Sequence, residues 1–130
     1  FDIDFFKQVN DNYGHAGGDA VLISFAQLLQ KEISSPNIIG RVGGEEFLAI
    51  LYLSPDEAKE FCVKLIYKIN HNFVDFEGTK IKISSSGGVA FSTETKTSAD
   101  LINKADERLY EAKKNGRNRF TLPDSELLGE

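Results

Sequence analysis

The fold is decided by the stretch Ile38-Ile39-Gly40-Arg41-Val42-Gly43-Gly44-Glu45-Glu46-Phe47-Leu48-Ala49-Ile50-Leu51-Tyr52-Leu53. Two apolar segments, 38–42 and 47–53, flank adjacent glycines, and glycine readily adopts the positive φ angles that a tight turn needs. The stretch therefore predicts a β-hairpin. Its second strand is apolar at consecutive positions, which predicts a strand that is covered on both faces of a sheet.

Helical periodicity on both sides of this hairpin predicts three helices. Apolar residues recur at three- and four-residue spacing in 19–33, from 54 to about 69, and in 98–115. Ser54 is a capping residue for the second helix, followed by Pro55 and by Glu57, which completes a capping box. Gly116 ends the third helix. The inward residues of the third helix are expected to be Leu101, Ile102, Ala105, Leu109 and Ala112.

Strand patterns fill the intervals between these helices. They predict strands over 1–5, 73–76, 81–91 and 119–122, with the second and third joined through Gly78. Segment 7–18 is polar and turn-rich, and 123–130 is expected to be a frayed tail. The element order predicts one α/β (α+β) domain, a mixed central β-sheet flanked by helices, over residues 1–122.

Composition excludes several classes of protein. The formal net charge of −5 disfavours a nucleic-acid partner, because proteins that bind nucleic acids usually carry an excess of basic residues. No apolar run is long enough to cross a bilayer, and the single Cys62 fits a buried position in a reducing cytoplasm. The chain opens without Met in a strand pattern, which we interpret as a piece of a longer protein whose domain faces the cytoplasm and which could be membrane-anchored.

Two acidic pairs are candidates for a metal site. Asp2 and Asp4 share one face of a strand end, and Glu45 and Glu46 lie at the hairpin tip. Carboxylate oxygens are the ligands that Mg²⁺ prefers, with water and substrate phosphate completing the octahedron. The sequence alone leaves open whether the two pairs meet. Solvated surface charges are the alternative, as a simple tight turn is for Gly43-Gly44.

Five ordered blocks give the chain a resemblance to a known family. Arg41-Val42-Gly43-Gly44-Glu45-Glu46-Phe47 resembles the signature of the GGDEF family of diguanylate cyclase domains in its GGEEF form. The other blocks are Asp2-Ile3-Asp4-Phe5-Phe6-Lys7, the stretch from Asn10 to Asp19, Ser86-Gly87-Gly88-Val89-Ala90, and the stretch from Ala105 to Arg119. In the fourth block Gly87 replaces the usual apolar residue. The resemblance spans residues 1 to about 122.

The resemblance implies a fold of the nucleotidyl-cyclase or palm type, which is ferredoxin-like, and the condensation of two GTP molecules into cyclic di-GMP with release of two pyrophosphates. It implies two Mg²⁺ ions per active site, with Mn²⁺ as a possible substitute. Asp2, Glu45, Glu46 and the carbonyl of Ile3 would bind these ions. Glu45 and Glu46 are also the candidate general bases, although metal activation of the 3′-hydroxyl could suffice.

The resemblance also implies substrate contacts. Asn10 and Asp19 would bind guanine, and the backbone of Phe5-Phe6-Lys7 would bind the terminal phosphates. Lys113 and Arg117, expected one turn apart on the last helix, would neutralise the triphosphate. Gly43 and Gly44 would let GTP approach the hairpin. Simpler alternatives remain: helix-end cations for Lys113 and Arg117, a helix cap for Asp19, and a turn for Asn10.

Catalysis on two GTP molecules implies a twofold dimer of the domain and an upstream sensory or dimerising domain. Ser34-Ser35-Pro36-Asn37 stands where many family members carry an R-x-x-D product-inhibition site, so feedback inhibition there is not expected. The family's opening segment, with its N-terminal helix, lies outside this chain. A non-catalytic module that binds GTP or cyclic di-GMP is the main alternative, and a related cyclase with another product is the second.

Overall fold

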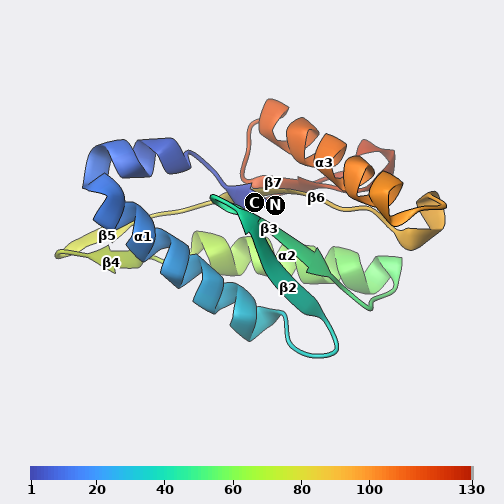
Figure 1. Cartoon of the computed structure of the whole chain (residues 1–130), viewed down its shortest axis with the longest axis horizontal. Coiled ribbons are helices and arrows are strands. Elements are labelled where there is room, and N and C mark those ends of the chain that lie inside the picture. The colour runs from blue at the N-terminus through green and yellow to red at the C-terminus, as the bar shows by residue number, and fades with distance from the viewer. Residues whose placement is uncertain (130) are drawn as a thin grey trace.

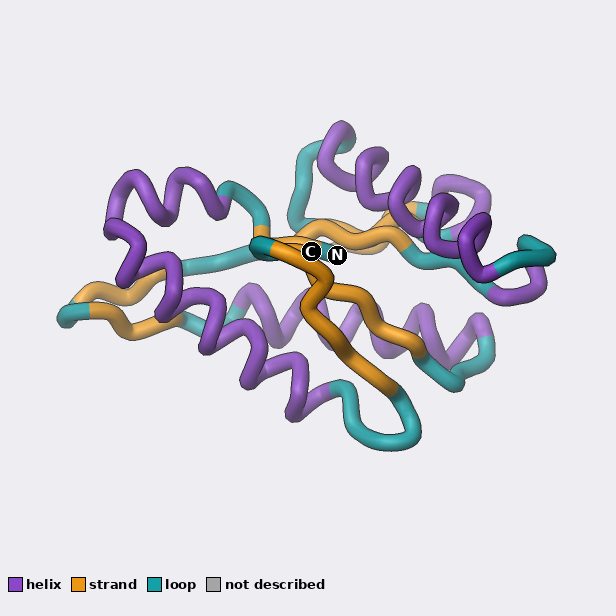
Figure 2. The backbone as a smooth tube through the Cα atoms, in the orientation of Figure 1, coloured by secondary structure: helices purple, strands orange, loops and turns teal. Residues whose placement is uncertain are grey.

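The computed structural model describes residues 1–129 and has a mixed central sheet with helices on both faces (Figure 2). The main sheet has the order β2-β3-β1-β6-β7-β8. Its strands are β1 (Asp2–Ile3), β2 (Ile38–Gly43), β3 (Glu46–Ile50), β6 (Ser85–Gly88), β7 (Arg119–Thr121) and β8 (Leu127–Gly129). The pair β6–β7 is parallel and the other pairs recorded in this sheet are antiparallel. The predicted fold class is confirmed.

The helices and a second hairpin complete the chain. The helices are α1 (Phe6–Glu32), α2 (Pro55–Asn70) and α3 (Ser98–Lys114), with short 3₁₀ turns at Ser92–Glu94 and Pro123–Ser125. Strands β4 (Val74–Phe76) and β5 (Thr79–Ile81) form a separate two-stranded sheet. The unit β1-α1-β2-β3-α2-β6, with spatial order β2-β3-β1-β6, has the ferredoxin-like βαββαβ arrangement.

The two faces of the sheet carry different chemistry. Gly87 faces the ring of Phe120, because a Cβ there would lie 2.9 Å from that ring. Gly88 faces α3, because a Cβ there would lie 2.0 Å from the carbonyl oxygen of Ala105. Successive strand residues point to opposite faces, so α3 covers one face and the main apolar core lies on the other. Figure 1 shows α3 beside β6 and β7, away from α1 and α2.

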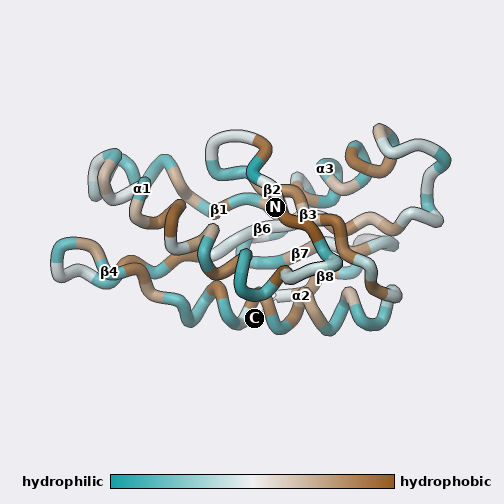
Figure 3. Tube along the Cα trace, turned by 60° about the horizontal axis from the view of Figure 1, so that its bottom comes forward, coloured by the Kyte–Doolittle hydropathy of each residue, from teal (hydrophilic) through white to brown (hydrophobic). Residues whose placement is uncertain are grey.

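The apolar core joins α1, α2 and the sheet. Its largest fully buried side chains include Phe25 and Leu29 of α1 and Leu65 and Ile69 of α2. The rings of Phe25 and Phe47 lie 5.3 Å apart between helix and sheet. In Figure 3, α2 alternates between hydrophilic and hydrophobic segments, as a helix that buries one face does. Among residues 1–129, no helix combines the length and the apolar character that a bilayer crossing requires.

Several local predictions are confirmed. Ser54 caps α2 in a complete capping box with Glu57. Gly116 follows α3 with a φ of +116°, and the β4–β5 hairpin turns through Gly78 at +81°. Cys62 is buried, and burial raises the pKa of its thiol to about 12, so it behaves as a core residue.

Segment 7–18 differs from its prediction. It is helical and belongs to α1, with a kink at Gly14, where φ is +74° and ψ is 176°. Tertiary packing overrides the weak helix propensity of its Asn, Asp and Gly residues, since Val9 is buried and a Cβ on Gly17 would lie 3.5 Å from the ring of Phe76 in β4. The bend of α1 is plain in Figure 1.

The strand predicted over 81–91 is divided in the structure. Ile81 pairs with Val74 in the small hairpin, whereas Ser85 pairs with Ile3 in the main sheet. The strand over 1–5 is also shorter than predicted and ends at Ile3. In both cases backbone pairing partners, which a single strand pattern does not reveal, set the boundaries.

Three further expectations need correction. The strand β3 does lie between β2 and β1, but Ile50 is 51% exposed, so the strand is not covered on both faces. It also ends at Ile50, before residues 51–53 of the predicted strand. Ile102 of α3 is 44% exposed rather than inward. Leu127–Gly129 of the expected frayed tail form β8, which pairs with β7 through backbone hydrogen bonds; Glu130 lies outside the described residues.

Candidate active site

The two acidic pairs meet where β1 lies beside the tip of the β2–β3 hairpin. Asp2 is the antiparallel Cα partner of Glu46. The Ile3 amide donates to the carbonyl of Glu45 at 3.3 Å, and the Phe47 amide donates to the carbonyl of Phe1 at 2.8 Å. Strand pairing thus answers the question that the sequence left open. It places Asp2 and Glu46 at neighbouring positions of one sheet.

The Asp2 carboxylate is buried and incompletely paired. It is 5% exposed, and its Oδ2 lies 2.5 Å from Nζ of Lys113 in the last turn of α3. Its Oδ1 is buried without any hydrogen-bond donor. Burial raises the pKa of this carboxyl above its ordinary value, while the hydrogen bond and charge of Lys113 oppose the rise. A buried anionic oxygen without a donor is a position that a cation would stabilise.

The other candidate ligands are less enclosed. Glu45 is half-buried and Glu46 is exposed, while the side chain of Ile3 lies in the core at 2% exposure. Only the backbone of Ile3 therefore faces the site. Within residues 1–129, no group of three or more His, Cys, Asp and Glu side chains is arranged to hold a metal ion. The site has one fixed carboxylate, Asp2, with movable carboxylates beside it.

The first turn of α1 begins beside this carboxylate. Phe5 is the residue before the helix, with a left-handed φ of +56°, and no side chain caps the helix there. Phe5 and Lys7 are exposed and Phe6 is half-buried. The first N–H groups of a helix have no intrahelical acceptor, and the helix dipole favours anions at that end. The turn Phe5–Lys7 therefore offers backbone donors of the kind that bind phosphate.

The two predicted phosphate-binding cations lie close to this turn, although only one belongs to α3. Lys113 is in the last turn of α3 and is paired with Asp2. Arg117 lies beyond the helix, with a φ of +64°, so the prediction that both cations share the helix is wrong. The guanidinium carbon of Arg117 lies 4.7 Å from the centre of the Phe5 ring, a cation–π contact. Arg117 thus contacts the residue before α1, while Lys113 pairs with Asp2 of β1.

The two predicted guanine-binding residues lie on either side of the kink in α1. A Cβ on Gly18 would lie 1.8 Å from Oδ1 of Asn10, so Asn10 packs directly against the backbone next to Asp19. Asn10 is half-buried and Asp19 is exposed. The glycine at position 18 is needed for this close approach. The Asn10 side chain thus lies against the backbone of Gly18, the residue before Asp19.

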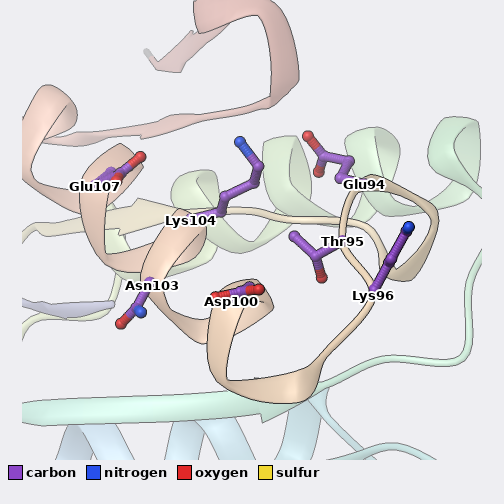
Figure 4. A pocket seen from close by; sticks show the side chains of 7 residues that line it. All are labelled: Glu94, Thr95, Lys96, Asp100, Asn103, Lys104 and Glu107. Atoms are coloured by element: carbon purple, nitrogen blue, oxygen red, sulfur yellow. The ribbon is translucent and has the colours of Figure 1, made fainter.

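The hairpin tip is open. Gly44 has a φ of +49°, and Cβ atoms built on Gly43 and Gly44 would meet nothing within 4 Å. Arg41 stabilises the turn, because its Nε donates to the carbonyl of Gly44 at 2.6 Å. Two surface hollows lie elsewhere and contain none of the predicted site residues. One lies between the Glu94 turn and α3 (Figure 4), and the other between α1 and β4.

Asp4, which the sequence groups with Asp2 as a candidate for a metal site, has a structural role that no sequence pattern predicted. It is 6% exposed, and its Oδ1 accepts from Oγ of Ser86 at 2.6 Å. Its Oδ2 accepts from Oγ of Ser84 at 2.7 Å and from the Asn118 amide at 2.9 Å. The signal that could have found it is the serine-rich stretch 84–86, whose hydroxyl groups suit a buried carboxylate.

Comparison with known proteins agrees with this geometry. Residues 1–119 match the model of the family described as diguanylate cyclase, GGDEF domain. Among curated relatives, diguanylate cyclase A of Treponema denticola is 37% identical over 97% of this chain and 34% of its own length. Diguanylate cyclase DgcS of Shewanella oneidensis is 34% identical over 97% of this chain and 42% of its own length. The chain thus spans less than half of either relative.

Solved structures share the fold. The active GGEEF domain of a diguanylate cyclase from Vibrio cholerae has a TM-score of 0.76 and 32% identity, over 93% of this chain and 78% of that one. The GGDEF domain of YfiN from Pseudomonas aeruginosa has a TM-score of 0.84 and 28% identity, over 93% of this chain and 77% of that one. Both the family model and the relatives cover nearly the whole chain. The chain therefore belongs to the GGDEF family of diguanylate cyclase domains.

Proposed function

We propose that this chain is the catalytic domain of a diguanylate cyclase that condenses two GTP molecules into cyclic di-GMP. In each half-reaction the 3′-oxygen of one GTP forms a bond to the α-phosphorus of the other. The bond from that phosphorus to its bridging oxygen breaks, pyrophosphate leaves, and the hydroxyl proton passes to a base or to solvent. Two such steps close the ring and release two pyrophosphates.

The observation that carries this proposal is the pairing of Asp2 with Glu46 beside the uncapped start of α1. An anion-binding helix end and a buried, incompletely paired carboxylate are adjacent there. The helix end favours an anion and the carboxylate favours a cation. Together they suit a nucleoside triphosphate with its divalent cation. A simple anion site would not need the carboxylate, and a simple cation site would not need the helix end.

The divalent cations would be Mg²⁺, two in each site, with Mn²⁺ as a substitute. Asp2, Glu45, Glu46 and the carbonyl of Ile3 would bind them, and the unpartnered Oδ1 of Asp2 fits this role. When bound, Mg²⁺ would lower the pKa of the 3′-hydroxyl and neutralise charge at the phosphates. Lys113 pairs with Oδ2 of Asp2, and with a cation bound at Asp2 its ammonium group would be available to the phosphates.

The remaining residues of the site would bind the two ends of the nucleotide, its phosphates and its guanine base. The first-turn amides of α1, Lys113 and Arg117 would bind the phosphates. Asn10 and Asp19 would accept and donate at the guanine edge, since a carboxylate suits the adjacent N1–H and N2–H donors of guanine. Gly43 and Gly44 leave the hairpin tip open for the nucleotide. Glu45 and Glu46 are the catalytic carboxylates and the candidate bases.

The reaction needs a partner domain. One domain would hold one GTP, so a second copy must face it across a twofold axis. The curated relatives are longer than this chain, which supports an additional, upstream regulatory domain in the whole protein. We propose a cytoplasmic domain without a nucleic-acid partner. Feedback inhibition through the Ser34–Asn37 segment is not expected, because it offers neither Arg nor Asp.

Product analysis tests the proposal directly. The full-length protein that contains this chain is incubated with GTP and Mg²⁺, and the products are identified by mass. We expect cyclic di-GMP and pyrophosphate, lost in Glu46→Gln and retained in the control Glu60→Gln, whose glutamate lies on the exposed face of α2. GTP binding without any product in the unmodified protein would instead favour the non-catalytic module.

A further inference from the structure

The segment that follows α3 has an unusual backbone. Gly116, Arg117 and Asn118 have consecutive positive φ angles of +116°, +64° and +51°. The left-handed region is unfavourable for residues with a Cβ, and two of these three residues are not glycine. Such a conformation persists only where the surrounding contacts fix it. The question is which contacts fix this segment, because it carries Arg117.

Besides the hydrogen bond from the Gly116 amide to the carbonyl of Lys113 at 3.4 Å, four hydrogen bonds within the described residues fix the segment. The Arg117 amide donates to the carbonyl of Ala112 at 2.9 Å, and Nε of Arg119 donates to the carbonyl of Arg117 at 2.9 Å. Nδ2 of Asn70 donates to Oδ1 of Asn118 at 2.8 Å. The fourth bond runs from the Asn118 amide to Oδ2 of Asp4 at 2.9 Å. Only this last bond ties the segment to the strand end that carries Asp2.

Asp4 is well suited to act as a fixed anchor. Both of its oxygens accept hydrogen bonds, from the Ser84 and Ser86 hydroxyls and the Asn118 amide. The carboxylate is buried, and these three donors are neutral. A buried carboxylate held by several donors has a defined orientation, and removal of one member leaves the others unsatisfied. Asp4 therefore fixes the place of the Asn118 amide relative to β1.

The position of Arg117 follows from this anchor. The residue directly before Asn118 is Arg117, and its guanidinium lies 4.7 Å from the Phe5 ring. Phe5 in turn directly follows Asp4 and precedes the first turn of α1. Two contacts thus join the neighbours Asp4 and Phe5 to the neighbours Arg117 and Asn118. They are the hydrogen bond from the Asn118 amide to Asp4 and the cation–π contact of Arg117 with Phe5. Loss of the hydrogen bond from the Asn118 amide to the Asp4 carboxylate would leave the cation–π contact as the remaining one of these two contacts.

We propose that Asp4 is a positioning residue for triphosphate recognition, whose buried carboxylate fixes the Gly116–Asn118 segment and so places Arg117 at the start of α1. This inference rests on the proposed function, in which Arg117 binds phosphate. Asp4 itself does not contact the nucleotide or the metal, because both of its oxygens are already engaged within the fold. Its effect passes through Arg117.

A double-mutant cycle tests the proposal in the full-length protein. Binding of a non-hydrolysable GTP analogue with Mg²⁺ is measured for the unmodified protein, Asp4→Asn, Arg117→Ala and the double variant. In Asp4→Asn an amide group replaces one acceptor, so the segment loses part of its anchor. We expect a loss of affinity on the order of 10-fold, as for other residues that orient a binding group. In the Arg117→Ala background the same change should cost about twofold or less.

The control is Asp75→Asn, the same substitution at an aspartate of β4 whose side chain is 74% exposed. It should leave affinity unchanged within about twofold. An equal loss for Asp4→Asn in both backgrounds would overturn the proposal, because a purely structural role does not depend on Arg117. If the unmodified protein bound no GTP analogue, the proposed function itself would fail, and the two failures are therefore distinct.

A second variant covers the case in which Asp4→Asn does not fold. An amide-to-ester replacement of the Asn118 backbone nitrogen, made by semisynthesis, removes only the N–H that donates to Asp4. The Ser84 and Ser86 bonds to Asp4 remain. We expect the same loss of analogue affinity, again absent when Arg117 is Ala. Unchanged affinity in the folded ester protein would overturn the role of this hydrogen bond.

Discussion

Asp2 and Asp4 lie two residues apart and are equally buried, yet their surroundings differ. Asp2 has one oxygen paired with Lys113 and one oxygen without a donor. Asp4 has three neutral donors and no unpaired oxygen. Burial of a charge is unfavourable unless it is fully paired. The incomplete pairing of Asp2 is consistent with the chemical role that we propose for it, whereas the complete pairing of Asp4 fits a residue that orders the structure.

The difference arises from what each residue faces. Asp2 lies beside the open hairpin tip and the flexible side chain of Lys113, which is partly exposed. Asp4 lies against the serine hydroxyls that precede and begin β6, and against the backbone of the segment after α3. One carboxylate can exchange its partner without disturbing the fold. The other cannot, because its partners are parts of the fold.

The largest expected effect separates the two residues by activity. Asp2→Asn should lower the rate of cyclic di-GMP formation by at least about 100-fold, the scale of removing one group that stabilises a transition state. Its fold should persist, because the amide can still accept a hydrogen bond from Lys113. The measurement is the product rate by chromatography, with circular dichroism to confirm folding. Near-normal activity of Asp2→Asn would remove Asp2 from the chemistry.

The second prediction separates the residues by stability. Asp4→Ala should lower the free energy of unfolding by about 3 kcal/mol, because it leaves the buried Ser86 hydroxyl and the part-buried Ser84 and Asn118 donors unsatisfied. Asp2→Ala should cost less, because Lys113 is partly exposed and can be solvated. Urea denaturation without metal or nucleotide measures both values. Equal losses for the two variants would contradict the division drawn here.

The third prediction concerns α3, the helix that carries Lys113, the partner of Asp2. A Cβ on Gly88 would lie 2.0 Å from the Ala105 carbonyl, so Gly88→Ala should displace α3, which carries Lys113. We expect a loss of about 1–3 kcal/mol in the free energy of unfolding, typical of overpacking. The matched control is Gly40→Ala in β2, where a Cβ would meet nothing within 4 Å. A stability of Gly88→Ala equal to that of the control would show that α3 does not rest on β6 as described.

The smallest expected effect concerns a third carboxylate, Glu94, which is paired nearer the surface. Arg108 donates to both of its oxygens at 2.8 and 2.6 Å, and this hydrogen bonding lowers the pKa of Glu94 below its ordinary value of 4.5. Because the folded-state pKa is the lower one, the stabilisation is present above pH 4.5 and is lost as the pH falls through the folded-state value.

We therefore expect Glu94→Gln to lower the unfolding free energy at pH 7 by less than about 1 kcal/mol. The difference from the unmodified protein should vanish in strongly acidic solution. Urea denaturation over a pH series measures it. A difference that grows as the pH falls would have the wrong sign and would exclude the Arg108 pair as its cause.

Much of the fold was accessible from sequence patterns. The hairpin around Gly43-Gly44, the cap at Ser54 and the helix end at Gly116 were predicted correctly, because each depends on local backbone preferences. Segment 7–18 was missed, because its helix is stabilised by packing of Val9, Gly17 and Gly18 rather than by propensity. The strand β8 was missed because its three residues are too few to show a strand pattern and it is defined by backbone pairing with β7.

The residue types of the proposed site can be read from the sequence: the carboxylates of Asp2, Glu45 and Glu46, the paired glycines, and the cations near the chain end. Motifs of this kind are local, and their chemistry can be read from residue identity and spacing. The tertiary structure alone decided that Asp2 pairs with Glu46, that Lys113 meets Asp2, and that Asp4 anchors the segment carrying Arg117. These contacts join residues 44 to 114 positions apart, and only chain folding brings such distant groups together.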